Sequence, residues 1–292
     1  VHDAVAAAAG FANLVVIDPG AVFVGIVDGG NSIGSAAVST LELASSASAG
    51  TLTGLGTQFV DFAQTTIDAG AAWRLTGANT LAAGSTLANA GILNLGSASL
   101  TGGGQLVNAG TIALDTGTLN VGGLSNPAGA SFIVDGSLTN AVTLAFGGGN
   151  GFASNGGTFE LTYAAPLTVS NSFTNSGTFG LHNETALTVT GSFANNAVLD
   201  IDTAYTNTGL AFTYAEGGSS LTVGGTLINT GSVQVGDSSG LIGGGIAYGL
   251  TAAATIALGG LVNGSGAKFI VDGSATNPVS LAFTGGGSGF AS

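Results

Sequence analysis

The chain has 292 residues, enough for one large domain or two ordinary ones; 53 of them are glycine and only 6% are charged. Two basic residues stand against 15 acidic ones, which gives a formal net charge of −13. This balance excludes nucleic acid and anionic lipid as partners, because both require several Lys or Arg side chains, and the absence of cysteine excludes disulfides and thiolate chemistry.

The first apolar stretch, residues 4–17, is interrupted by Gly10 and Asn13. It falls short of the roughly 20 apolar residues that span a membrane. It also lacks the basic region of a secretory signal, because His2 and Asp3 precede it. We therefore expect no membrane insertion of this segment.

A Gly-Ala-x-aromatic step follows this stretch and recurs along the chain. The steps begin at Gly20, Gly70, Gly129 and Gly266, and their aromatic residues are Phe23, Trp73, Phe132 and Phe269. Trp73 is the only tryptophan and takes the place that phenylalanine fills in the sibling units. We expect it to pack in the core rather than to stack on a ligand.

A shorter unit lies underneath, with the form L-x-V-x-x-x-(F/L)-x-N-x-x-x-(F/L/V)-x-(L/V). Its fullest copies are LTVSNSFTNSGTFGL from Leu167, LTVTGSFANNAVLDI from Leu187 and LTVGGTLINTGSVQV from Leu221. Alternation with period two predicts short strands with one buried face, joined by Asn-x-Gly or Gly-Gly turns. One position of the unit is always asparagine: Asn89, Asn108, Asn126, Asn175, Asn195, Asn229 and Asn263.

Short strands repeating at about 19 residues predict an all-β chain that folds as an elongated parallel β-solenoid, with one repeat per turn. Stacked turns lie about 4.8 Å apart, so the repeated asparagines can form a hydrogen-bonded ladder. A sandwich with Asn-Gly hairpins is the alternative, but sandwiches do not repeat at this spacing. We expect residues 1–292 to form a single solenoid of about 14–16 rungs.

Two long segments also match, residues 122–154 and residues 259–292, at an offset of 137. We expect them to be the same local structure about seven rungs apart. The inward-pointing side chains should be Phe132, Val134 and Leu144 in the first copy and Phe269, Val271 and Leu281 in the second. Because the second copy stops at the chain end, we expect the chain to be a fragment of a longer repeat protein.

The segments IDPGAVFVG, GTQFVDFAQTTIDAGAAWRLTG and the L-x-V-x-G-x-L-x-N-x-G units resemble the passenger regions of bacterial autotransporters and two-partner-secreted haemagglutinin-like adhesins. The resemblance implies a right-handed parallel β-helix, an extracellular or bacterial cell-surface location, and a structural or adhesive stalk that meets a host or environmental surface or glycan. It carries over no functional residue, because the family has no shared catalytic motif. A self-assembling extracellular filament, with copies associating end to end, is the alternative.

Polysaccharide-active enzymes also use β-helices, and their chemistry requires cationic or paired acidic side chains. Arg74 and Lys268 are 194 residues apart and cannot share a site, so we expect both on the surface. Glycoside hydrolysis needs two carboxylates about 5–10 Å apart. The best pair is Asp200 and Asp202 in VLDID, which we expect on the outer, solvent-facing side of one strand.

The remaining polar residues predict structural roles. We expect Asp28, Asp135 and Asp272, each in an IVDG step, to serve turns, and the glycine clusters at Gly147 and Gly285 to form tight corners. His182 should lie in a turn between two units, and neither it nor His2 has a second histidine nearby for a metal pair. We therefore predict a non-enzyme without catalytic, metal or cofactor site, although the acidic balance leaves weak Ca²⁺ binding open.

Overall fold

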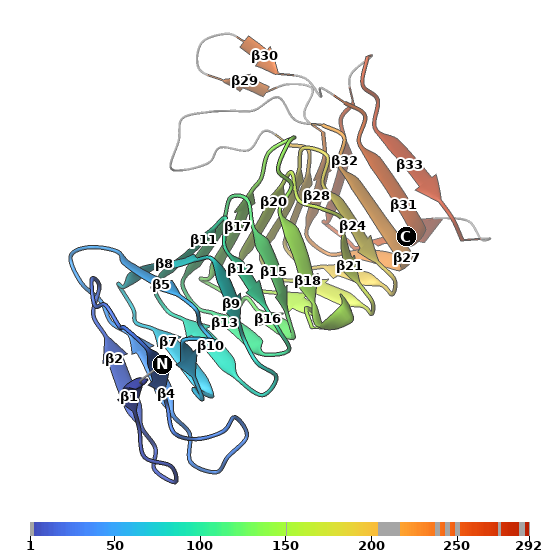
Figure 1. Ribbon diagram of the computed structural model, residues 1–292. Coiled ribbons are helices and arrows are strands. Elements are labelled where there is room, and N and C mark those ends of the chain that lie inside the picture. Colours follow the sequence, from blue (N-terminus) through green and yellow to red (C-terminus); the bar gives the residue numbers. More distant parts are fainter. Residues whose placement is uncertain are drawn as a thin grey trace. The chain divides into compact units, whose positions relative to one another are not determined.

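The computed structural model describes residues 3–149, 151–203, 217–236, 240–242, 246–248, 252–273, 276–285 and 290–291. The chain divides into two compact units: unit 1 comprises Val1–Gly136 and Val142–Phe152, and unit 2 comprises Ser137–Ala141 and Ala153–Ser292. The fold is an all-β parallel β-solenoid of about 11 turns with rungs of about 23 residues. The predicted fold class is therefore confirmed (Figure 1).

The predicted count of 14–16 rungs is wrong, and the seven-rung separation of the long copies fails with it. The 19-residue unit is real where corners are tight, since Asn89 and Asn108 are 19 residues apart on adjacent rungs. Elsewhere a rung carries a long insertion: Asn195 and Asn229 also lie on adjacent rungs but are 34 residues apart. The average turn is therefore longer than the unit that the pattern revealed.

In unit 1, successive turns place strands on three faces, and strands stacked on one face are parallel. The first face holds β2 (Leu14–Ile17), β4 (Thr40–Leu43), β7 (Gln64–Ile67), β10 (Thr86–Asn89), β13 (Gln105–Asn108) and β16 (Gly123–Ser125). The second holds β5 (Gly50–Thr53), β8 (Ala72–Thr76), β11 (Ile92–Gly96), β14 (Thr111–Leu114) and β17 (Ser131–Asp135). The third holds β9 (Ala78–Thr80), β12 (Ser99–Thr101), β15 (Thr118–Val121) and β18 (Thr143–Phe146). A small sheet of β1 (Asp3–Ala6), β3 (Ile26–Asp28) and β6 (Phe59–Val60) precedes these, and η1 (Gly147–Gly149) follows β18.

In unit 2 the second face holds β20 (Thr158–Thr162), β23 (Thr178–His182), β26 (Val198–Ile201), β28 (Ser232–Val235) and β32 (Lys268–Val271). A larger sheet holds β19 (Ser154–Asn155), β21 (Leu167–Val169), β22 (Phe173–Asn175), β24 (Ala186–Val189), β25 (Phe193–Asn195), β27 (Ser220–Asn229), β31 (Thr255–Asn263), β33 (Ser280–Phe283) and β34 (Phe290–Ala291). All their pairings are parallel, whereas β29 (Gly240–Ile242) and β30 (Ile246–Tyr248) form an antiparallel pair. No helix in the described part of the chain is long and apolar enough to cross a membrane.

The core consists of rows of inward side chains, one from each stacked strand. Phe132, Val134 and Leu144 are buried as predicted, and so is Trp73, whose Nε1 donates to the Ala44 carbonyl at 3.0 Å. The predicted burial is wrong for Val271, which is 43% exposed. Phe269 and Leu281 are half-buried, so they are covered less than predicted. The reason is that β32 and β33 each end their stack in the described chain, so their side chains are covered from one side only.

The predicted asparagine ladder is present in both units. In unit 1 the Nδ2 of Asn89 donates to Oδ1 of Asn108, and Asn108 donates in turn to Asn126, both at 2.9 Å. In unit 2 the ladder runs Asn155, Asn175, Asn195, Asn229, Asn263, with links of 2.7–2.9 Å. Asn155 was not among the predicted ladder residues, although it begins the segment NGGTFEL just as Asn175 begins NSGTFGL.

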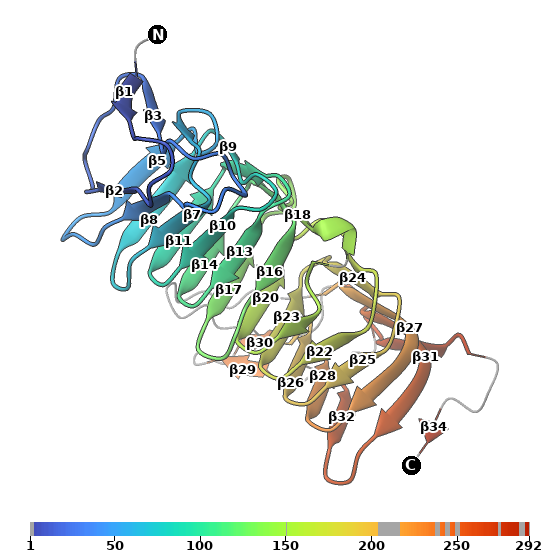
Figure 2. The same ribbon diagram turned by 90° about the horizontal axis from the view of Figure 1, so that it is seen from below.

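Six of the ladder asparagines also hold the corner to the next rung. The second hydrogen of Nδ2 reaches the carbonyl of the residue that starts a second-face strand one turn on: Thr111 for Asn89, Ser131 for Asn108 and Ser232 for Asn195, each at 2.9 Å. The main-chain carbonyl of Asn195 accepts from the amide of Thr230 at 2.8 Å. Figure 2 shows the stacked strands β10, β13 and β16 whose ends carry the unit 1 ladder.

We predict that Asn195→Ala lowers the free energy of unfolding by about 1–3 kcal/mol, because the buried Oδ1 of Asn229 and the part-buried carbonyl of Ser232 lose their donor. The matched control is Asn196→Ala, one residue along and exposed, which should cost much less. Urea unfolding followed by circular dichroism measures both. Equal costs for the two variants would show that the ladder does not stabilise the fold.

Candidate functional site

The described residues contain one buried cluster of ionisable side chains, on the second face of unit 2. Strands β20 and β23 pair in register, so Glu160 lies beside Gly180 and Thr162 beside His182. The Nε2 of His182 and Oε2 of Glu160 are 2.9 Å apart, and the two side chains are 2% and 6% exposed. The contact depends on Gly180, because a Cβ there would overlap both the Glu160 carboxylate and the His182 ring.

Asp202 is the third ionisable member, and it lies just past the end of β26. Its carboxylate accepts hydrogen bonds from the amide of Ser219 at 2.8 Å, from the Ser219 hydroxyl at 2.7 Å and from the amide of Asn183 at 3.1 Å. Burial raises the pKa of Asp202 above its ordinary value of 3.8, while these hydrogen bonds and the neighbouring His182 oppose the rise.

The prediction that Asp200 and Asp202 share the outer side of one strand is wrong. Asp200 lies on β26 and is half-buried, whereas Asp202 adopts a left-handed backbone conformation with φ of 50° and is 1% exposed. Asp tolerates this region better than most residues, and the resulting corner turns its carboxylate inward. The sequence likewise predicted a turn for His182, which instead is the last residue of β23.

Other predicted positions behave as surface or corner residues. Arg74 and Lys268 are both exposed, and Asp28 caps its turn by accepting from the Gly30 amide at 2.7 Å. Burial and the adjacent carboxylate of Asp115 raise the pKa of Asp135. The cluster at Gly147 forms the tight corner η1, with positive φ at all three glycines.

Two predictions fall outside the described chain: that for His2, and most of that for the glycine cluster that begins at Gly285. Within the residues that the structure describes, no group of three or more His, Cys, Asp or Glu side chains is placed to hold a metal ion.

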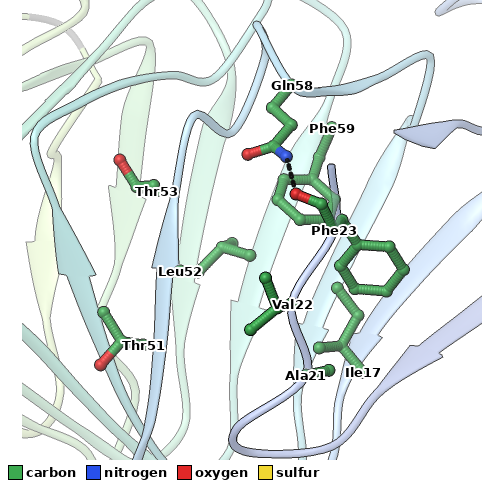
Figure 3. A pocket seen from close by; sticks show the side chains of 9 residues that line it. All are labelled: Ile17, Ala21, Val22, Phe23, Thr51, Leu52, Thr53, Gln58 and Phe59. Carbon is green, nitrogen blue, oxygen red and sulfur yellow. Dashed lines mark hydrogen bonds between the residues drawn. The ribbon is translucent and has the colours of Figure 1, made fainter. Parts of the chain in front are cut away.

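A hollow of about 170 Å³ opens at the start of unit 1 (Figure 3). It is lined by Ile17, Ala21, Val22, Phe23, Thr51, Leu52, Thr53, Gln58 and Phe59. The rings of Phe23 and Phe59 meet edge to face with centroids 5.7 Å apart. None of the lining side chains is ionisable, so the hollow offers apolar contact and hydroxyl or amide groups but no acid or base.

The sequence missed Glu160 because the position between the inward Phe and Leu of the unit is variable, with Gly180 and Asp200 at the same place. Only the strand register shows that a glycine separates the two acids and opens the space for His182. The sequence did not predict the hollow. It exists because residues 21–24 do not form the strand that their Gly-Ala-x-aromatic motif predicts.

We predict that wild-type protein loses stability relative to Asp202→Asn as the pH rises from below 3.8. The folded pKa of Asp202 is raised above its unfolded value, so in that window the folded state binds more protons and the free energy of unfolding falls with rising pH. The Asn side chain does not ionise and lacks this dependence. Urea unfolding at a series of pH values measures the difference.

Ser219→Ala provides the control for this assignment. It removes one hydrogen bond that stabilises the ionised carboxylate, so the pKa of Asp202 should rise further and the loss of stability with pH should grow. A difference between wild type and Asp202→Asn that stays constant with pH would contradict the assignment.

No family model matches the chain, and no curated protein or solved structure is detectably similar to it. The repeats and the fold of the chain identify it as a parallel β-solenoid structural module with an asparagine ladder.

Proposed function

We propose that the chain is a passenger-type stalk of a secreted or cell-surface bacterial protein, with a structural and adhesive role and no enzymatic one. The observation that carries the proposal is the in-register stacking of rungs on continuous asparagine ladders. In such a stack each rung is stabilised by its neighbours, so length can be added without enlarging the core.

The composition supports an exposed setting. A chain without cysteine or methionine presents no thiol or thioether to oxidants. Its net charge of −13 opposes unspecific association. The outward positions of strands carry small hydroxyl and amide side chains, such as Thr168, Thr188 and Thr222, which lie in register on adjacent rungs.

The buried ionisable cluster is better explained by folding than by catalysis. A general acid or base must reach the proton of its substrate within hydrogen-bond distance. Glu160 and His182 face one another and are almost fully covered, and Asp202 already accepts three hydrogen bonds from the protein. We therefore propose that the cluster fixes the corner after β23.

We predict that antibodies against this chain label intact cells of the native host, and that electron microscopy shows rods tethered to the cell at one end. A cytoplasmic marker that is labelled only after permeabilisation serves as control. Continuous fibres with a regular repeat would instead favour a filament subunit. Recovery of the full-length product in the soluble cytoplasmic fraction would contradict both roles.

We also predict that incubation with acidic and neutral polysaccharides yields no new reducing ends and no unsaturated uronates. The reason is that two exposed carboxylates at catalytic spacing are needed, and Asp202 is withdrawn from the surface. Cleavage that is lost in Asp200→Asn or Glu160→Gln, while the exposed-site variant Asp18→Asn keeps it, would overturn the non-enzymatic role.

A further inference from the structure

The rung that precedes β5 is closed on only two of its three sides. β2 pairs in register with β4, and β3 pairs with β6. The segment between β2 and β3 lies next to β5 but forms no strand with it. Its side chains Val22 and Val24 are 85% and 89% exposed. As a result, β5 is the edge strand of the second face in unit 1.

The segment that fails to pair carries the motif that forms second-face strands elsewhere. The turn is the same in all four copies: the amides of Ala21, Ala71, Ala130 and Ala267 donate to the carbonyl three residues earlier at 3.0–3.1 Å, and Gly20, Gly70, Gly129 and Gly266 all have positive φ. In the three later copies the following residues form β8, β17 and β32. In the first copy the turn is formed but the strand is not.

Two hydrogen bonds from Gln58, called the clip below, hold residues 21–24 in place, and the hollow lies beside them. The Nε2 of Gln58 donates to the carbonyls of Phe23 and Gly25 at 3.0 and 3.1 Å, so it holds the segment by its main chain. The hollow lies between this segment and Thr51–Thr53 of β5 (Figure 3). The hollow therefore separates residues 21–24 from β5, the two segments that would pair if the strand formed.

We propose that residues 21–24 are a switchable strand, which pairs with β5 in a closed form of this rung. The register follows from the neighbouring pair, in which Trp73 lies beside Gly50 and Arg74 beside Thr51. Phe23 and Val24 hold the places of Trp73 and Arg74 in the motif, so in the closed form they lie beside Gly50 and Thr51. Closure fills the hollow and pairs the edge of β5.

The two forms differ in what they offer to other chains. An unpaired parallel edge accepts an added strand from another molecule, and covering it removes that possibility. The open form therefore exposes the β5 edge for strand addition, and the closed form protects it with the chain's own segment. Breaking the Gln58 clip shifts the balance toward closure.

Disulfide trapping tests the closed register, and the chain contains no cysteine to interfere. In-register neighbours lie about 4.8 Å apart, within the Cα separation that a disulfide spans. We expect Val24→Cys with Thr51→Cys to form a disulfide under mild oxidation about tenfold faster than Val22→Cys with Thr51→Cys, which is two residues out of register. All three positions are exposed, so folding should survive.

Thr51→Cys with Arg74→Cys is the positive control, because these residues are already paired. Gln58→Ala should raise the rate for the Val24 pair several-fold and leave the rate of the positive control unchanged. If the positive control forms readily while the Val24 pair is no faster than the Val22 pair, residues 21–24 do not pair with β5. If Gln58→Ala leaves the Val24 rate unchanged, the clip does not govern the switch.

Discussion

Stacking of one rung on the next in parallel register is the constraint on which this molecule depends. Register brings equivalent residues of successive turns to the same place, so a side chain packs against the same type of side chain on the rungs above and below. Asparagine suits this arrangement because its amide is both donor and acceptor, and a column of them satisfies itself. The links at Asn108, Asn175 and Asn195 repeat within 0.1 Å of one another, as expected when the main-chain register sets the spacing.

The first asparagine of the unit 1 ladder shows that the register can also leave a polar group without a partner. In unit 1 the column changes from Asn89 to Ile67, which is its neighbour on the preceding rung. The Oδ1 of Asn89 therefore faces an aliphatic side chain and is buried without a hydrogen-bond partner. Leaving a buried acceptor unsatisfied is unfavourable, so the ladder gains most from each internal link and least at the point where it begins.

The cluster around Glu160 shows how the same register creates a local exception. The outward positions of three adjacent strands are Glu160, Gly180 and Asp200. Glycine in the middle lets His182 reach back across the strand to Glu160. Asn183 and Asp202 then both turn the corner with positive φ, a conformation that asparagine and aspartate tolerate, and the Asn183 amide binds the Asp202 carboxylate. Several polar groups are thus buried together because each satisfies another.

The period-two strands, the parallel solenoid and the asparagine ladder could be predicted from the amino-acid sequence, since they follow from the residue pattern and from the tolerance of Asn and Gly for tight turns. Inward residues such as Phe132 and Val134 were predictable for the same reason. The length of a rung could not be predicted in this way, because an insertion such as that between Asn195 and Asn229 leaves the register of the stacked strands intact and does not change the repeat pattern on either side. Only the tertiary structure shows that Asp202 is buried while Asp200 is not, and that Phe23 stays out of the sheet although Trp73 enters it. In each case the outcome depends on which strands lie above and below, and that neighbourhood is set by the stack rather than by the local sequence.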